Sequence, residues 1–493
     1  MKPTLAFLLG FTLFSRVAGL LNLTAIFAPS LSPGAEIILP GDVDWGTKVQ
    51  ARWSDYACPT FIGVIKPMTE SDIQHTVRIA QLHNIRFLAT GGGQSFSDYR
   101  TFEGISIDLG NFNTAKFDDT HTLLTIGGAV KYNQLTDLLY NASKELPLAS
   151  CACPGVVGAT LGAGIGPLMG LRGLMIDALE SVRLVTADGN LVTASHEENP
   201  DLFWGIRGAG SNFGIVTSAT FRVWGITNNG LAMSAGLVFP ASVNASYWRV
   251  LQTFDTDMPP QLALTNMAFF DRQTNQPYIV LNAIYFGPRE AGEPYLERFR
   301  KLGPLNDTVR MIPQNTLFPP VLGSCTPGQV VNIHSVAVRR TDPETLQSVF
   351  ADMNRFWRQH PGYQGRLLIP RLANDAAANV PHNETSFPWR KAIAHISIEG
   401  YMNDSSIHEI ANDFQQSLRS RIAGSSGYDY LATYAGYARG NEGAGSWYSS
   451  RNLASLSSLK RIWDPNLVFA YNKPIPLKPW DYLVEPWKYI STN

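Results

Sequence analysis

The sequence predicts an α+β protein of two domains, and three observations lead to this prediction. Short strand-like and helix-like segments alternate up to about residue 225. From there to about residue 430, longer strand-like runs are separated by amphipathic helices, as in an antiparallel sheet backed by helices. The 42 glycines and 31 prolines are spread over all 493 residues, which favours loops and strands over a helical bundle.

The first helix is predicted from Thr69 to Asn84. Thr69 or Ser71 can cap its start, and apolar residues recur at helical spacing from Ile73 to Ala80. The next predicted elements are strands over 85–89, 104–109 and 123–128 and a helix over 132–140.

The second part of the chain continues with longer elements. Strands are predicted over 278–285 and 330–338, and helices over 344–357 and 407–422. A last helix over 453–462 ends before Pro465, because the residue preceding a proline disfavours the helical conformation.

The composition and the N-terminus limit the classes of partner. Charged residues make up 16% of the chain and the formal net charge is −1, so nothing points to nucleic acid. Residues 1–19 have the pattern of a signal peptide, with Lys2, an apolar stretch over 5–14 and small residues at Ala18 and Gly19. No later run of 18 apolar residues predicts a membrane span. We expect entry into the secretory pathway and an extracellular or vesicular location.

Glycosylation sites and cysteines fit that pathway. Six N-x-S/T sequons would place their loops at the surface, namely Asn22, Asn141, Asn244, Asn306, Asn383 and Asn403. The four cysteines, Cys58, Cys151, Cys153 and Cys325, allow three pairings, and the sequence does not choose among them. A bridge between Cys151 and Cys153 would need a cramped geometry.

A glycine turn follows the strand over 85–89. Gly91, Gly92 and Gly93 have no Cβ atom, so their backbone N–H groups can approach a bound anion closely. The turn therefore suggests a site for the pyrophosphate of a nucleotide or dinucleotide. An ordinary turn without a ligand is the alternative reading of three glycines alone.

Several catalytic motifs are absent. Glycine-rich stretches at 155–170 and 208–214 do not fit the dinucleotide fingerprint, since Pro167 and Phe213 replace the third glycine. The sequence also lacks a P-loop, the zincin motif and a nucleophile elbow. These absences count against a Rossmann dehydrogenase, a nucleotide triphosphatase, a zinc protease and an α/β-hydrolase. No metal-ligand cluster is found among the nine histidines.

The order of the motifs is more specific than any single one. After the glycine turn come Cys-x-Cys at 151–153 with its glycine run, then 173–177, 181–189 and 199–216. This order closely resembles the PCMH-type FAD-binding domain of the vanillyl-alcohol-oxidase superfamily, and the nearest branch is the fungal berberine-bridge-enzyme-like oxidases. The C-terminal stretches 447–448, 464–469 and 472–476 support the branch. The resemblance implies a FAD-binding domain over 50–228, a substrate domain over 229–430 and a C-terminal segment over 431–493 that returns to the first domain.

The resemblance implies FAD as the cofactor and places its contacts. The glycine turn, made of Thr90, Gly91, Gly92, Gly93, Gln94 and Ser95, would wrap the pyrophosphate. The flavin would be lined by Gly158, Gly162 and Gly164, with backbone contacts from Gly210, Gly214, Ile215 and Val216. Three residues near the C-terminus would close over the isoalloxazine, namely Tyr434, Tyr437 and Asn472.

One position departs from the family pattern. The family has a histidine bonded to the flavin 8α carbon where this chain has Gln94, and a carboxamide nitrogen is not nucleophilic. No histidyl link is therefore expected. Cys151 aligns with the family's second attachment residue, and it would form a single cysteinyl link, stay free or join a disulfide. Gly436 also replaces the asparagine of the family's Tyr-x-Asn-Tyr segment.

The catalytic base is sought on a strand of the substrate domain. Alternation over 394–399 puts His395, Ser397 and Glu399 on one face, and His395 has a solution pKa suited to general-base work. A hydrogen-bonded or surface histidine is the plainer interpretation. Tyr434 or Tyr437 would be the alternative base or an oxyanion partner.

The resemblance implies a secreted FAD-linked oxidase. A base would remove a proton from a small organic substrate while hydride passes to flavin N5, and molecular oxygen would reoxidise the flavin. A secondary-metabolite intermediate is the expected substrate. The alternatives are a cyclase of the same fold without net redox, a carbohydrate oxidase and an inactive ligand-binding protein.

Overall fold

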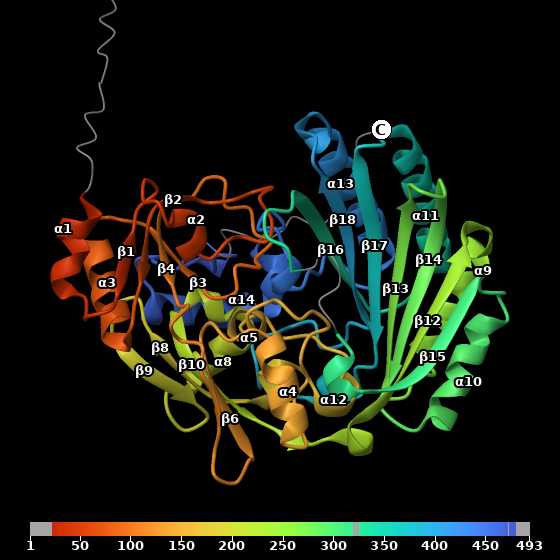
Figure 1. Cartoon of the computed structure of the whole chain (residues 1–493), viewed down its shortest axis with the longest axis horizontal. Coiled ribbons are helices and arrows are strands. Elements are labelled where there is room, and N and C mark those ends of the chain that lie inside the picture. Colours follow the sequence, from red (N-terminus) through yellow and green to blue (C-terminus); the bar gives the residue numbers. More distant parts are fainter. Residues whose placement is uncertain (1–21, 319–324, 472, 480–493) are drawn as a thin grey trace, which may run out of the picture.

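The computed structural model describes residues 22–318, 325–471 and 473–479 (Figure 1). The predicted signal peptide and Asn472 lie outside the described residues. Two sheet-containing bodies lie side by side in Figure 1, one built from the first half of the chain and the other from the second. The α+β class predicted from the sequence is confirmed.

The first body contains two main sheets. A four-stranded sheet has the order β1-β2-β4-β3, with β2 and β3 both parallel to β4. A five-stranded antiparallel sheet has the order β5-β6-β10-β8-β9. The strands are β1 (Glu36–Ile38), β2 (Thr60–Lys66), β3 (Phe87–Thr90), β4 (Glu103–Asp108), β5 (Ala115–Phe117), β6 (Leu123–Gly127), β8 (Leu179–Val185), β9 (Leu191–Ser195) and β10 (Ile215–Arg222), with a small ribbon of β7 (Lys144–Glu145) and β11 (Trp224–Gly225).

Short helices connect these strands. They are α1 (Leu23–Phe27), α2 (Trp45–Lys48), α3 (Glu70–Leu82), α4 (Asn133–Asn141), α5 (Val156–Thr160), α6 (Met169–Arg172), α7 (Met175–Ala178) and α8 (Pro200–Ala209). The start of α3 is a capping box, in which Thr69 accepts from the Asp72 amide and Asp72 accepts from the Thr69 amide. The helix buries Ile73, Val77 and Ala80 completely and leads into β3 and the glycine turn.

The second body is a seven-stranded antiparallel sheet covered on one face by helices. Its order is β15-β12-β14-β13-β17-β18-β16. The strands are β12 (Leu231–Pro240), β13 (Leu262–Asp271), β14 (Gln276–Tyr285), β15 (Asn306–Pro313), β16 (Val331–Val338), β17 (Tyr363–Leu372) and β18 (Ala394–Met402), and the helices are α9 (Asn244–Gln252), α10 (Arg289–Arg300), α11 (Pro343–Gln359), α12 (Asp375–Asn379) and α13 (His408–Ser425).

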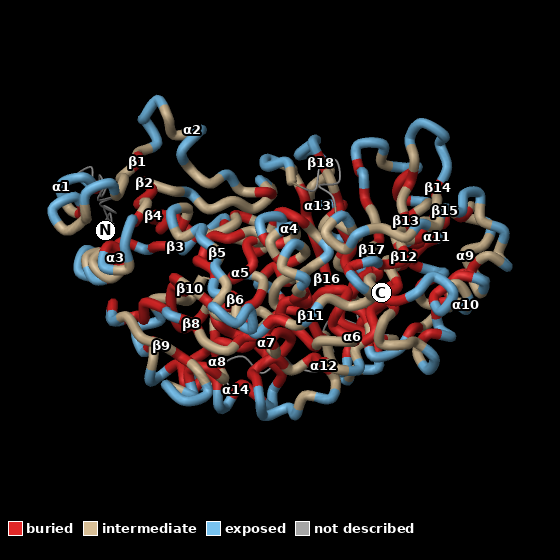
Figure 2. The backbone as a smooth tube through the Cα atoms, turned by 60° about the horizontal axis from the view of Figure 1, so that its bottom comes forward, coloured by how far each residue is buried: buried red, intermediate tan, exposed pale blue. Residues whose placement is uncertain are grey.

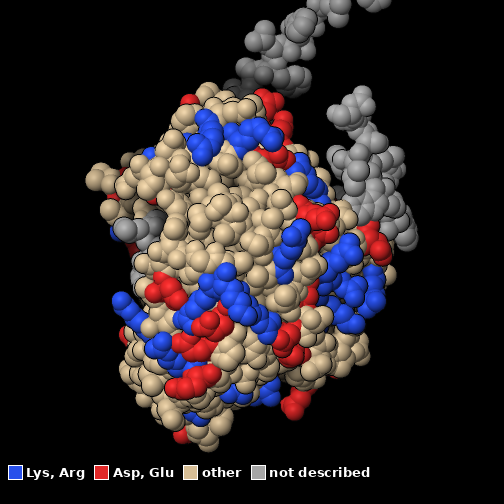
Figure 3. Space-filling model, turned by 90° about the vertical axis from the view of Figure 1, so that its right-hand side faces the viewer, with Lys and Arg blue, Asp and Glu red and all other residues tan. Residues whose placement is uncertain are grey.

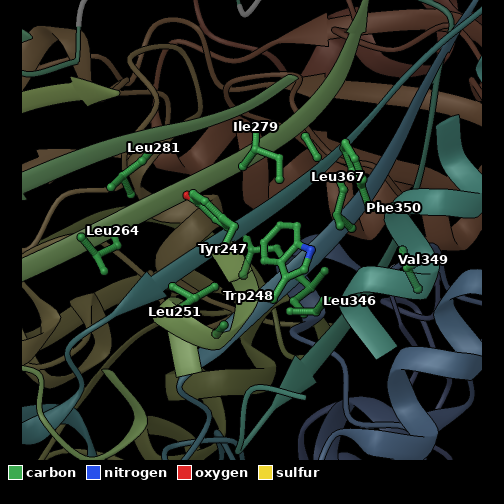
Figure 4. Close-up of a cluster of buried hydrophobic side chains, with 14 of the residues drawn as sticks. Tyr247, Trp248, Leu251, Leu264, Ile279, Leu281, Leu346, Val349, Phe350 and Leu367 are labelled. Atoms are coloured by element: carbon green, nitrogen blue, oxygen red, sulfur yellow. The ribbon is translucent and has the colours of Figure 1, made fainter. Parts of the chain in front are cut away.

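The helices and the sheet of this second body enclose an apolar core. Trp248 of α9 and Phe350 of α11 meet Leu264, Leu281 and Leu367 from the strands (Figure 4). Because alternate strand residues face this core, the remaining residues of each strand line the opposite face of the sheet. That opposite face is where the cavity described below is found.

The end of the chain returns to the first body. Helix α14 (Ala444–Trp463) starts earlier than the predicted 453–462, and its φ/ψ angles are interrupted at Ser449. It packs Leu453, Leu456 and Leu459 into the core that surrounds the five-stranded sheet. Buried segments are concentrated through the middle of the molecule (Figure 2). The face in Figure 3 carries charges of both signs side by side, in keeping with the net charge of −1.

Candidate functional site

A cavity of about 1100 Å³ is lined by residues of both bodies. Its wall combines the glycine turn, α5, the open face of the seven-stranded sheet and the C-terminal segment. The predicted site residues that line it are Thr90, Gly91, Gly92, Gly93, Gln94, Ser95, Cys151, Gly158, Gly162, Gly164, Gly214, Ile215, Val216, Tyr434 and Tyr437. Segments more than 300 residues apart thus form one site.

The glycine turn has the features of an anion cradle. Among the described residues, the amides of Gly91, Gly92 and Gly93 donate to no backbone or side-chain acceptor. A Cβ at Gly92 would lie 2.4 Å from the Gly155 nitrogen, and Gly93 has a φ of +71°. Side chains are therefore excluded for steric and conformational reasons, while the N–H groups remain available to a ligand.

The floor of the cavity also fits a flat cofactor. A Cβ on Gly158 of α5 would meet nothing within 4 Å, so the backbone faces open space there. Tyr434 fixes the neighbouring glycines, since its hydroxyl donates to the Ala159 carbonyl (3.1 Å) and accepts from the Gly164 amide (3.3 Å). These residues fit the flavin of FAD, which would lie along α5 and the glycine run.

Gly210 does not line the cavity, which corrects the contact predicted for it. A Cβ at this position would lie 2.6 Å from Leu161 Cδ2, and the Gly210 amide donates to the Leu161 carbonyl. The absence of a side chain serves helix packing here. Its neighbours Gly208 and Ser211 line the cavity instead.

Cys151 has a free thiol that lines the cavity, and Cys153 forms a disulfide with Cys325. This pairing joins the first body to the second body. Burial raises the pKa of the Cys151 thiol, so the thiol form is favoured in this structure. Gln94, which stands where the resemblance implies a histidine, also lines the cavity.

A polar cluster in the cavity surrounds Glu399 on β18. Its Oε2 accepts from Arg366 Nε (2.6 Å) and from the Tyr401 hydroxyl (3.2 Å), and its Oε1 accepts from the Ser397 hydroxyl (3.0 Å). Arg366 also donates to the Tyr401 oxygen over 2.6 Å. Glu399 is 6% exposed, so this is a buried carboxylate with a fixed orientation.

His395 lies on the same strand face but outside the cavity lining, which corrects its assignment as the base. Its ring packs against Tyr434 at 5.7 Å, and its Nδ1 has no hydrogen-bond partner among the described residues. Burial lowers the pKa of His395 to about 3, so the imidazole is neutral at physiological pH. Alternation predicts the shared strand face of both residues, but only Glu399 lines the cavity.

The two tyrosines differ in what their hydroxyls can do. The Tyr434 hydroxyl is already used as donor and acceptor, and burial raises the pKa of Tyr434 to about 12. No hydrogen bond within the described part of the chain uses the Tyr437 hydroxyl, and burial raises the pKa of Tyr437 as well. Tyr437 is therefore a neutral donor at the cavity wall, whereas Tyr434 has a supporting role.

Sequence reasoning missed Arg366, Tyr401, Lys473 and Arg52, all of which line the cavity. Arg366 is brought to Glu399 by the register of β17 and β18, which no local motif encodes. Tyr401 and Glu399 could have been found from the sequence, because both continue the strand alternation that includes His395.

Comparisons with known proteins agree with this site. A family model described as FAD binding domain matches residues 61–195. The FAD-linked oxidoreductase tazG of Aspergillus terreus is 47% identical, covering 92% of this chain and 95% of that protein. The FAD-linked oxidoreductase azaL of Aspergillus niger is 43% identical, covering 92% and 98%.

Solved structures share the fold at low identity. BBE-like 1 of Physcomitrella patens has a TM-score of 0.81 and 21% identity, covering 92% of this chain and 99% of that chain. The xylooligosaccharide oxidase from Myceliophthora thermophila C1 has a TM-score of 0.80 and 21% identity, with the same coverage.

This chain belongs to the FAD-linked oxidoreductases and has the PCMH-type, berberine-bridge-enzyme-like fold. The family and cofactor predicted from the motif order are confirmed. The chain is therefore an FAD-linked oxidoreductase. Across its described helices, none has the length and apolar character needed to cross a membrane.

Proposed function

We propose that this enzyme oxidises an apolar small molecule, a secondary-metabolite intermediate, with Glu399 as the general base and molecular oxygen as the final electron acceptor. The observation that carries the proposal is the buried Glu399–Arg366–Tyr401 cluster at the wall of the cofactor cavity. Tyr437, whose hydroxyl is a neutral donor at the same wall, would bind the substrate oxygen.

Glu399 has one acceptor position left for a substrate. A carboxylate offers about four lone-pair positions, and Arg366, Tyr401 and Ser397 occupy three of them. These contacts hold the group in one orientation, and the Arg366 guanidinium balances its charge. A substrate hydroxyl bound at the remaining position lies within reach of proton transfer.

FAD, when bound, supplies the hydride acceptor, and the glycine turn together with Gly158, Gly162 and Gly164 would hold it. Glu399 takes the proton from the substrate hydroxyl. The substrate loses two electrons and two protons overall, and one O₂ is reduced to one H₂O₂. Cys151 would add at most one thioether bond, because Gln94 provides no nucleophile for a second one.

The sheet beside Glu399 favours an apolar substrate over a carbohydrate. The strand register places Phe269 opposite Arg366 and Met267 opposite Leu368, and all four line the cavity. An apolar strip from β13 and β17 therefore begins next to the Glu399 cluster. Apolar walls with a few convergent polar groups are typical of sites for hydrophobic small molecules.

The test is anaerobic mixing of the full-length holoenzyme with benzylic and polycyclic alcohols and, separately, with cellobiose and xylobiose. Bleaching of the flavin absorbance by the apolar alcohols, followed by H₂O₂ formation in air, is the expected result. Bleaching by the sugars alone would replace the proposal by a carbohydrate oxidase. Conversion of an alcohol without O₂ uptake would indicate the redox-neutral cyclase, and a purified chain unable to take up FAD would indicate a ligand-binding protein.

We also propose that the chain passes through the secretory pathway and is glycosylated. Five sequons support this because their asparagines are exposed, namely Asn22, Asn141, Asn306, Asn383 and Asn403. The disulfide between Cys153 and Cys325 fits an oxidising compartment. Peptide mass mapping of the secreted protein, with and without glycosidase, tests it.

A further inference from the structure

A buried lysine lies at the end of the cavity that contains the glycine turn. Lys473 lines the cavity and is only 5% exposed. Its Nζ donates to the Ser97 hydroxyl over 2.6 Å, and Ser97 is in turn bonded to Ser95 of the glycine turn. The backbone of Lys473 is also held in place, because its carbonyl accepts from the Tyr448 hydroxyl (2.6 Å) and from Asn212 Nδ2 (3.2 Å).

A second cation lies at the same end. The Arg52 guanidinium is 5.1 Å from the centre of the Tyr99 ring, and Arg52 also lines the cavity. The Tyr99 hydroxyl lies 3.2 Å from Ser95 Oγ. Burial by itself raises the pKa of Tyr99, but the charges of Lys473 and Arg52 outweigh it, and the pKa of Tyr99 lies below its ordinary value. The field at this end of the cavity is therefore positive.

Among the residues that the structure describes, no carboxylate contacts either of these two cations. Within the described part of the chain, neither Lys473 nor Arg52 forms an ion pair with an acidic side chain. Glu442 is the acidic group that acts on Lys473 through space, and it is already paired with Arg419. Burial lowers the pKa of Lys473, and a bound anion would offset this effect. Lys473, Arg52 and the amides of the glycine turn therefore form a site suited to an anion.

We propose that Lys473, together with Arg52, binds the diphosphate of FAD and so supplies by charge the cofactor retention that a histidyl bond would give at position 94. The proposal rests on the FAD cofactor of the family and is independent of the substrate and of the base proposed above. The shared chemistry, a buried anion, would also suit a carboxylate on the substrate. The diphosphate is favoured because Lys473 is hydrogen-bonded through Ser97 to the glycine turn, whereas the Glu399 cluster lies on β18.

The experiment measures the retention of FAD by the full-length holoenzyme in a Cys151→Ala background, which removes the thiol as a covalent anchor. After dilution, the fluorescence of released flavin gives the Kd. Lys473→Met is expected to weaken FAD binding about 10- to 100-fold, the usual effect of losing a charge-assisted hydrogen bond. Lys473→Arg should recover most of the loss, and the exposed Lys116→Met serves as the charge-matched control.

Replacing FAD by flavins with fewer phosphates distinguishes the diphosphate from a substrate carboxylate as the anion bound by Lys473. Riboflavin carries no phosphate, so its affinity should be the same in the Lys473→Met variant and its parent, while the affinities for FMN and FAD fall. The Kd of the parent should also rise more steeply with salt than that of the variant.

Equal weakening of riboflavin and FAD, or a FAD Kd within about twofold of the parent, would overturn the proposal. A second outcome would also overturn it. If Lys473→Met binds FAD like its parent and benzyl alcohol like its parent, but binds 4-hydroxybenzoate more weakly, the site is assigned to a substrate carboxylate. If Lys473→Met does not fold, judged by circular dichroism, Arg52→Gln is measured in the same way. The proposal then requires Arg52→Gln to bind FAD more weakly than the parent and riboflavin equally well.

Discussion

Glu399 and Arg366 lie opposite each other on β18 and β17, with Arg366 Nε 2.6 Å from Glu399 Oε2. The pair is cross-strand, so its geometry depends on sheet register rather than on a loop. Ser397 and Tyr401 flank Glu399 on the same strand face, and both donate to it. The carboxylate therefore has a single defined orientation toward the cavity.

Replacing Glu399 by glutamine should lower kcat by about 10²- to 10⁴-fold, because an amide cannot accept the proton. FAD content, measured by visible absorbance, should stay unchanged, since Glu399 belongs to the sheet rather than to the glycine turn. His395→Leu is the comparison on the same strand and should retain most of the activity. Near-normal turnover in Glu399→Gln would remove Glu399 from the role of base.

The attachment of the flavin can be read from peptide masses. No tryptic peptide containing Gln94 should carry a flavin, because its side chain is not a nucleophile. In Cys151→Ala, acid precipitation should leave all yellow colour in the supernatant, since Cys151 is the free thiol of the cavity. A yellow pellet from that variant would reveal an attachment residue elsewhere.

Buried histidine makes the protein sensitive to mild acid. The pKa of His395 is about 3 in the folded state, below its ordinary value of 6.5, so the unfolded state binds the extra proton. Its contribution is therefore fully present above pH 6.5 and is lost as the pH falls toward 3, at about 1.4 kcal/mol per pH unit. Urea midpoints between pH 7 and pH 5 should fall less in His395→Leu than in the parent. The exposed His83→Leu should keep the parental slope.

A buried ion pair connects the two bodies. Arg390 is fully buried and donates to both carboxylate oxygens of Asp177, at 2.7 and 3.1 Å. Asp177→Ala should destabilise the protein by about 3–5 kcal/mol, because it leaves an uncompensated buried charge. The exposed pair of Arg222 and Glu180 offers a control, for which Glu180→Ala should cost below about 1 kcal/mol. Equal losses in chemical denaturation would contradict the expectation.

Asn244 should stay without a glycan while the other sequons are available. Its Nδ2 donates to the Gln347 carbonyl (3.1 Å), and its Oδ1 accepts from Trp248 Nε1 (2.6 Å). A glycan on Nδ2 would disrupt the packing of α9 on α11. Peptide mapping of the secreted protein should find Asn244 unmodified. A glycan on every copy of Asn244 would contradict this and would mean that α9 packs on α11 only after glycosylation.

The local parts of the site could be predicted from the sequence, and the non-local parts could not. The glycine turn is encoded by consecutive residues and lies where it was expected, beside the cavity. Strand alternation placed Glu399 on the correct face. It could not give the partner Arg366, which lies 33 residues from Glu399 and depends on the pairing of two strands.

Lys473 is the site residue farthest in sequence from its hydrogen-bond partner among those discussed above, since 376 residues separate it from Ser97. No spacing rule spans such a distance. Gly210 shows the opposite error, because its place in a cofactor motif predicts a binding role, whereas its missing side chain makes room for Leu161. The cysteine pairing likewise required the three-dimensional arrangement of Cys153 and Cys325.

The cavity has walls from both ends of the chain, and this sets a sequence of events during synthesis. The ribosome completes the glycine turn early, but Tyr437 and Lys473 emerge only when translation is nearly finished. A nascent chain thus spends most of its synthesis with half of a cofactor site. We therefore expect tight capture of FAD only by the finished polypeptide, and a chain that stops before α14 should be isolated without flavin.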